Sequence, residues 1–165
     1  SRDTLYASEW SPAMAVPIPA DSALPDHLPR VDYADAYAVT LPPGSSTDPR
    51  EWVDRLFSHP PTALRVLMGA RDRLVGAVGL KRADHQEAGP FPELARTDNE
   101  VVLGMDDLHL DFRVGVHVVE VADGVRLTVG TVVQFHNAFG RLYFLPVRPA
   151  HKVIVRSMLH RASKH

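Results

Sequence analysis

Four polar side chains with acid/base or ion-pairing chemistry lie close together in the predicted sheet. His109, Asp111 and Arg113 alternate along one predicted strand, so their side chains share a face. On the next strand, His136 is predicted to lie opposite Asp111. A carboxylate beside an imidazole orients the ring and raises its proton affinity. We therefore predict His109, Asp111 and His136 as catalytic residues for general acid/base chemistry, with Arg113 as a ligand-binding residue.

The same residues have two other interpretations. Polar residues that face outward are the norm on an antiparallel sheet with one buried face, so a structural contact in solvent is the favoured interpretation of the pair of carboxylate and imidazole. Two histidines and one carboxylate also resemble a metal-binding set. No pattern of supporting residues accompanies that set, so we expect no metal and no cofactor. Whether the protein is an enzyme stays open at this point.

Two alternating strands around Asp123 and Gly124 position these residues. Asp-Gly between two alternating runs is a strong signal for a hairpin. With Asp123 and Gly124 as the turn, Phe112 is expected to face Phe135 on an apolar surface, and the opposite surface is polar. A strand with one buried face specifies its register strongly, because a slip by one residue exchanges the two faces.

The remaining elements follow from periodicity and from breaking residues. Alternation predicts a first strand over residues 32–41, and Asp48 followed by Pro49 predicts the start of a helix. The rest of the pattern predicts a second helix at 62–78, a polar connection at 80–99, a strand at 100–105, a turn or short strand at 139–146 and a last helix at 149–163.

Residues 1–30 are predicted to form a proline-rich arm, and residues 31–165 a single domain. Five prolines in the arm favour extended, polyproline-like chain. The arm is expected to rest on its own domain or on a neighbouring molecule, with Trp10, Met14, Val16 and Ile18 as anchors. A homodimer through the arm is therefore an open alternative.

Composition narrows the class of protein. The chain has 165 residues, no cysteine and a formal net charge of -2. Disulfides and thiolate chemistry are excluded, and no basic surface suggests a nucleic acid partner. No apolar run approaches the roughly 20 residues that span a bilayer. We expect a soluble cytoplasmic protein that binds neither nucleic acid nor membrane.

Several strings resemble an uncharacterised bacterial family of domains of unknown function, whose members stand alone or follow a short-chain-dehydrogenase-like NAD(P)-binding domain. The matching strings are YADAY at 33–37, DPREW at 48–52, DDLHLDFRV at 106–114, TVV at 131–133, HN at 136–137, GRLY at 140–143 and PVRPAH at 146–151. Ala150 departs from the pattern, since an aromatic residue is expected there. The order of elements also resembles the helix-grip fold of the START, Bet v 1 and polyketide-cyclase-like (SRPBCC) superfamily. This resemblance implies an α+β fold in which a curved antiparallel sheet wraps a long C-terminal helix, with two helices after the first strand.

The helix-grip resemblance implies a hydrophobic cavity between the sheet and the last helix. Our leading expectation is that a small hydrophobic molecule binds there, in a cavity of about 300 Å³ or more. Besides Arg113, the predicted ligand-binding residues are Phe112, Phe135, Val133, Tyr143, Arg148 and Met158. One alternative is an enzyme of the cyclase, dehydratase or isomerase type that uses the pair of histidine and aspartate. Another is an interaction module for a partner domain.

Overall fold

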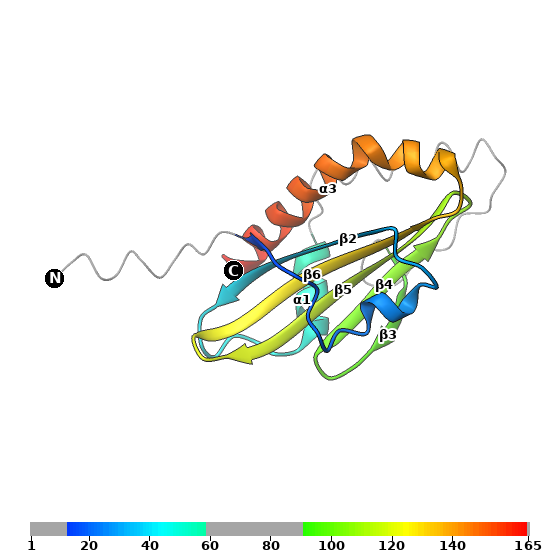
Figure 1. The fold of residues 1–165 in the computed structure, drawn as a ribbon. Helices are drawn as coiled ribbons and strands as arrows, with labels where there is room; N and C mark the ends of the chain where they lie inside the picture. The colour runs from blue at the N-terminus through cyan, green and yellow to red at the C-terminus, as the bar shows by residue number, and fades with distance from the viewer. Residues whose placement is uncertain (1–12, 59–90, 165) are drawn as a thin grey trace.

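The protein is an α+β structure in which a C-terminal helix packs on an open antiparallel sheet (Figure 1). The computed structural model describes residues 13–58 and 91–164. The six strands, in sheet order, are β1 (Met14–Ala15), β2 (Tyr33–Leu41), β6 (Gly124–Phe135), β5 (Leu110–Val121), β4 (Glu100–Asp106) and β3 (Glu93–Arg96). The helical elements are the 3-10 helix η2 (Leu24–His27), α1 (Pro49–Phe57) and α3 (Ala138–Ser163). The predicted helix at 62–78 lies outside the described residues.

Local sequence signals explain the confirmed elements. β2 and β4 lie where strands were predicted, and the helix predicted at Asp48 is α1. The Asp48 side chain accepts a hydrogen bond from the Arg50 backbone N–H. Pro49 occupies the first turn, where a backbone N–H would have no acceptor within the helix, so its missing N–H costs nothing. No helix in the described ranges is both long and apolar enough to cross a membrane.

The predicted register of the hairpin was wrong by two residues. Ala122 and Asp123 form the connection, and Val121 pairs with Gly124. Phe112 therefore pairs with Val133 instead of Phe135, and Asp111 with Gln134 instead of His136. Because the shift is even, each side chain keeps its predicted face.

A close approach between two strands explains why Gly124 is not the second turn residue. Its φ of +150° is a conformation that other residues rarely adopt. A Cβ atom at this position would overlap the carbonyl oxygen of Leu41 on β2. The glycine thus allows β6 to pack closely against the end of β2. The turn lies one residue earlier than predicted, at Ala122 and Asp123.

Three further predictions were wrong. The strand β3 lies in the segment predicted as a polar connection, and β1 lies in the arm that was predicted without strands. The last helix begins at Ala138 rather than at 149, so 139–146 is helical. Asn137 caps α3 by accepting from the Gly140 N–H, and the helix continues through Pro146 and Pro149. Both prolines are exposed, so the carbonyls that they leave without a partner can be solvated.

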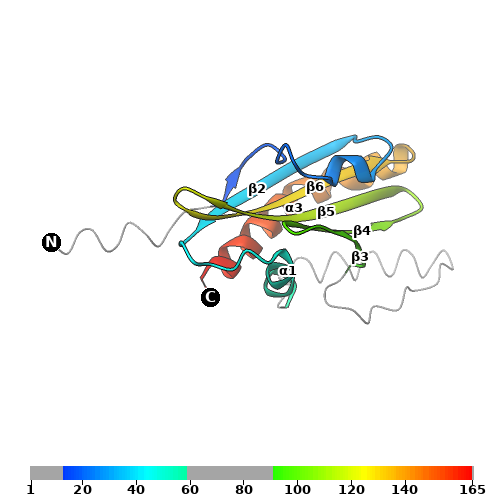
Figure 2. The same cartoon turned by 90° about the horizontal axis from the view of Figure 1, so that it is seen from below.

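Each face of the sheet is covered by a different part of the chain. Figure 2 shows α1 and α3 on one side of the sheet and the blue η2 segment on the other. The helix-facing core contains Val114, Val116 and Val129 from the hairpin, packed with Ile154 and Met158 of α3. The predicted apolar face is therefore buried against the last helix.

The described part of the arm docks on the other face of the same sheet. The Leu24 side chain lies against the paired Gly115 and Gly130, where a Cβ atom at Gly130 would be 2.9 Å from Leu24 Cδ2. The carboxylate of Glu100 accepts hydrogen bonds from the Ser22 hydroxyl and the Ala23 N–H. Much of the face predicted as polar is thus covered. Exchange of the arm between two copies stays a prediction.

The predicted anchors of the arm are only partly correct. Ile18 packs in the cluster beneath the arm, but Met14 is 64% exposed, and Trp10 lies outside the described residues. Leu24 and Leu28 are the buried residues of the arm in this cluster. The two glycines create the space that Leu24 fills, and this complementarity is not visible in the arm sequence alone.

Replacing Leu24 with alanine should lower the free energy of unfolding by about 2–4 kcal/mol, because a side chain that is 1% exposed leaves a cavity over the sheet. Urea unfolding followed by fluorescence measures this loss. The exposed Met14→Ala variant is the matched control in the arm and should change stability by less than about 0.5 kcal/mol. Equal effects of the two variants would show that the arm does not dock through Leu24.

Candidate functional site

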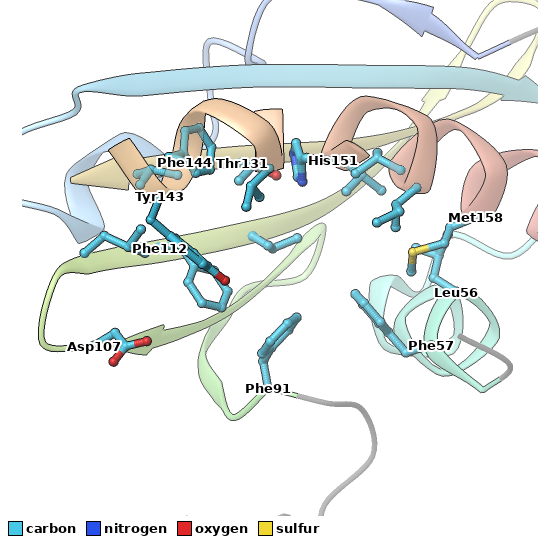
Figure 3. A pocket seen from close by; sticks show the side chains of 17 residues that line it. Leu56, Phe57, Phe91, Asp107, Phe112, Thr131, Tyr143, Phe144, His151 and Met158 are labelled. Atoms are coloured by element: carbon cyan, nitrogen blue, oxygen red, sulfur yellow. The ribbon is translucent and has the colours of Figure 1, made fainter. Parts of the chain in front are cut away.

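An apolar pocket of about 170 Å³ lies between the sheet and α3, next to α1 (Figure 3). Strand alternation and the helical period place its walls. Phe112 and Val133 are direct partners on β5 and β6, and Val147, Ile154 and Met158 follow the inner side of α3. The pocket therefore lies where the resemblance to helix-grip proteins implied a cavity.

The pocket is smaller than the predicted 300 Å³ because aromatic rings occupy one side of the space. Phe57 of α1 and Phe91 pack edge to face, with ring centroids 6.3 Å apart, and Phe91 packs on Phe112 at 4.9 Å. An apolar cavity of roughly 150 Å³ holds one benzene molecule. The space therefore suits a molecule about the size of a single ring.

Polar residues from β2, β6 and α3 meet at one wall of the pocket. His151 of α3 reaches β2, where its Nε2 lies 3.3 Å from Oδ1 of Asp35. The Tyr33 hydroxyl donates a hydrogen bond to the other carboxylate oxygen of Asp35, Oδ2, at 2.6 Å. Asp35 and Thr131 are register partners on β2 and β6, so both point toward the helix side. Figure 3 shows His151 and Thr131 on the side of the pocket away from Phe91.

Thr131 presents a hydroxyl with unused hydrogen-bonding capacity. The residue is 4% exposed and lines the pocket. Its Oγ1 atom has no hydrogen-bond partner among the described residues. A buried hydroxyl without a partner costs about 1–3 kcal/mol, so a group of a bound molecule that engages it gains affinity.

Burial and the neighbouring Asp35 carboxylate hold the Tyr33 side chain in its neutral form. Burial raises the pKa of Tyr33, and the hydrogen bond to Asp35 raises it further. The guanidinium of Arg148 lies over the tyrosine ring, 4.8 Å from its centroid, and opposes this rise in the pKa of Tyr33 without cancelling it. Tyr33 therefore acts as a donor that fixes Asp35 and does not compete for the proton of His151.

The residues predicted as catalytic lie elsewhere. His136 and Asp111 do form the predicted pair, with Nε2 and Oδ1 2.9 Å apart, although they are not register partners. Both belong to the sheet face that is turned away from α3, and the His136 side chain is 36% exposed. His109 is half-buried, with Nδ1 beside the Asn137 amide and its ring against Phe139. None of the three lines the pocket.

The predicted ligand-binding residues divide into two groups. Phe112, Val133, Tyr143 and Met158 line the pocket. The other three predicted residues do not line it: Phe135 packs on Phe144, Arg113 binds Asp106 at 2.7 Å, and Arg148 lies over Tyr33. In the described ranges, no cluster of three or more histidine, aspartate or glutamate side chains is arranged to hold a metal ion.

Asp35, Thr131 and His151 were not among the predicted site residues, although all three lie in strings that carry the family resemblance. A usable signal was present. Asp35 shares a strand face with Tyr37 and Val39, and Thr131 lies among the valines of the apolar face of β6. A polar residue that interrupts a buried face is a stronger indication of a site than polar residues on a face already polar.

Fold and site together define an α+β protein with a six-stranded antiparallel sheet, a C-terminal helix packed on it and an apolar pocket between them. Residues 27–158 match the family described as "Protein of unknown function (DUF2867)", and the chain belongs to that family. Neither the curated proteins nor the solved structures contain a match to the chain.

Proposed function

We propose that the protein binds a small, ring-sized, largely apolar molecule in the pocket between its sheet and α3. The observation that carries this proposal is the pocket itself. Protein interiors are normally packed to the density of organic crystals, so an apolar space within the core is an exception that suits a ligand. Nearly all of its wall consists of side chains such as Phe112, Val133 and Ile154, which favour an apolar guest.

We propose further that the fold is of the helix-grip type found in the START, Bet v 1 and polyketide-cyclase-like superfamily. The order of the strands, the C-terminal helix on the sheet and the position of the pocket support this assignment. The absence of cysteine and the resemblance to a bacterial family support a bacterial cytoplasmic protein.

Toluene, a ring-sized apolar probe, should raise the melting temperature of the protein. At a free concentration of about 100 times Kd, binding to the native state alone gives roughly 2.7 kcal/mol, or a rise of roughly 5–10 °C. Val147→Trp should abolish the rise, because Val147 lines the pocket and the larger ring fills it. Differential scanning calorimetry measures both results.

Val153→Trp is the matched control, since Val153 lies on the same helix with 65% exposure. This variant should keep the full response to toluene. An equal response from both variants, or no response from the parent protein, would contradict binding in the pocket. Native mass spectrometry of protein purified from its own host would then identify the natural ligand by the mass that travels with it.

A further inference from the structure

We propose that the pocket selects ring-sized molecules bearing an acidic hydroxyl, a phenol or an enol, and that His151 accepts the hydroxyl proton while Thr131 donates a hydrogen bond to the oxygen. This inference rests on the proposed binding function and names the chemistry of the ligand. It follows from the arrangement of three groups at one wall of an otherwise apolar pocket.

The first group is the imidazole, whose orientation is set by its partners. Asp35 Oδ1 engages Nε2 of His151, and Asp35 is itself held by the Tyr33 hydroxyl on Oδ2. With Nε2 committed to the carboxylate, Nδ1 is the ring nitrogen that exchanges a proton with a ligand. Asp35 is thus a positioning residue, and its negative charge stabilises the imidazolium once that cation forms.

The second group is the Thr131 hydroxyl. It is buried in the wall of the same pocket, without a partner in the described part of the chain. Thr131 is the strand partner of Asp35, and Asp35 is hydrogen-bonded to His151. The hydroxyl and the imidazole therefore belong to one polar cluster in the wall of the pocket. A ligand hydroxyl oxygen in this position accepts a hydrogen bond from Thr131, and its proton passes to His151.

The charges near the polar cluster favour a ligand that enters neutral. Asp35 faces it from β2, and Asp107 lines the pocket from the connection between β4 and β5. The Tyr33 hydroxyl donates a hydrogen bond to Asp35, the Arg148 guanidinium lies over the Tyr33 ring, and Tyr143 lines the pocket from α3. A carboxylate would meet the negative charges of Asp35 and Asp107 in an apolar cavity, which is costly. A hydroxyl avoids that cost until its proton moves.

The proton transfer balances without another reactant. The ligand O–H bond breaks, its electron pair stays on the oxygen, and an N–H bond forms at Nδ1 of His151. The products are an oxyanion hydrogen-bonded to Thr131 and an imidazolium paired with Asp35. The site therefore acts as a general base toward a bound hydroxyl.

The test uses 4-nitrophenol, whose ionised form absorbs visible light, and 4-nitrotoluene, which has the same ring but no acidic proton. At a pH where free 4-nitrophenol is mostly neutral, the bound probe should be at least about tenfold more ionised than the free probe. His151→Gln should leave the bound probe neutral, and Asp35→Asn should reduce its ionisation. Thr131→Val should lower the preference for 4-nitrophenol over 4-nitrotoluene roughly tenfold.

His136→Gln is the matched control, because it removes a histidine from another pair of histidine and aspartate, outside the pocket. This variant should ionise 4-nitrophenol as the parent protein does. If 4-nitrotoluene binds but 4-nitrophenol stays neutral, or if ionisation persists in both His151→Gln and Asp35→Asn, the acid/base inference is wrong and the binding function stands. If neither probe binds the parent protein, both proposals are overturned.

Discussion

Replacing Gly124 with valine should lower the free energy of unfolding by at least about 4 kcal/mol, the largest loss that we expect from any single exchange outside the deep core. Two costs add at this position. The φ of +150° disfavours any side chain, and a Cβ atom would overlap the Leu41 carbonyl oxygen, a backbone atom that has no other rotamer. Relief requires β6 to move away from β2, and that movement disrupts their pairing.

The matched comparison uses alanine at two glycines with positive φ. Gly44 has a φ of +86°, and a Cβ atom there would meet nothing within 4 Å. Gly44→Ala should therefore cost only the conformational penalty of about 1–2 kcal/mol, and Gly124→Ala clearly more. Urea unfolding of the two variants measures the difference. Similar losses would mean that the close approach of Gly124 to Leu41 is not present in solution.

Gly140→Ala should destabilise the protein by about 3 kcal/mol, although helix propensity alone predicts a gain of about 1 kcal/mol. Gly140 lies in the first turn of α3, directly on the backbone of His109. A Cβ atom would overlap the His109 carbonyl oxygen, which is held in place by a hydrogen bond from the His136 N–H at 2.9 Å. The helix start must therefore shift.

A shift of the helix start also moves Tyr143 and Phe144, which line the pocket. Gly140→Ala should thus weaken toluene binding as well as stability, as measured by calorimetry. Leu142→Ala, an exchange at an exposed position of the same turn, is the control and should change stability by less than about 0.5 kcal/mol. A gain in stability for Gly140→Ala would show that α3 does not rest on His109.

The faces of the hairpin could be predicted from the sequence because alternation depends only on neighbouring residues. Val114, Val116 and Val129 are buried on the predicted face. The register was not equally accessible. It depends on how closely Gly124 approaches Leu41, which is a contact between strands far apart in sequence. A shift by two residues preserves the alternation, so the pattern could not detect it.

The first half of α3 was missed because its sequence contains residues that usually break helices. Gly140, Pro146 and Pro149 all fall within the observed helix. What outweighs them is burial: Phe144 packs on Phe135 and Tyr33, and Val147 faces the pocket one turn later. Tertiary contact of this kind overrides local propensity and becomes visible only when the sheet is in place.

The location of the candidate site could be predicted only in part. The position of the cavity followed from the resemblance to helix-grip proteins, whereas the reactive pair did not. Asp35 and His151 are separated by 116 residues, and only the packing of α3 on β2 brings them together. The pair predicted instead, His136 and Asp111, was chosen because the two residues are close on the hairpin. Closeness on the hairpin does not tell which face of the sheet borders a cavity.

The two isoleucines of the chain offer the most direct test of binding between the sheet and α3. Ile154 lines the pocket, whereas Ile18 packs on the opposite face of the sheet with Leu24 and Val132. In a protein labelled at the isoleucine δ1 methyl groups, titration with toluene should move the Ile154 signal along a saturable curve and leave the Ile18 signal in place. An unmoved Ile154 signal, or equal movement of both signals, would contradict a ligand site in this pocket.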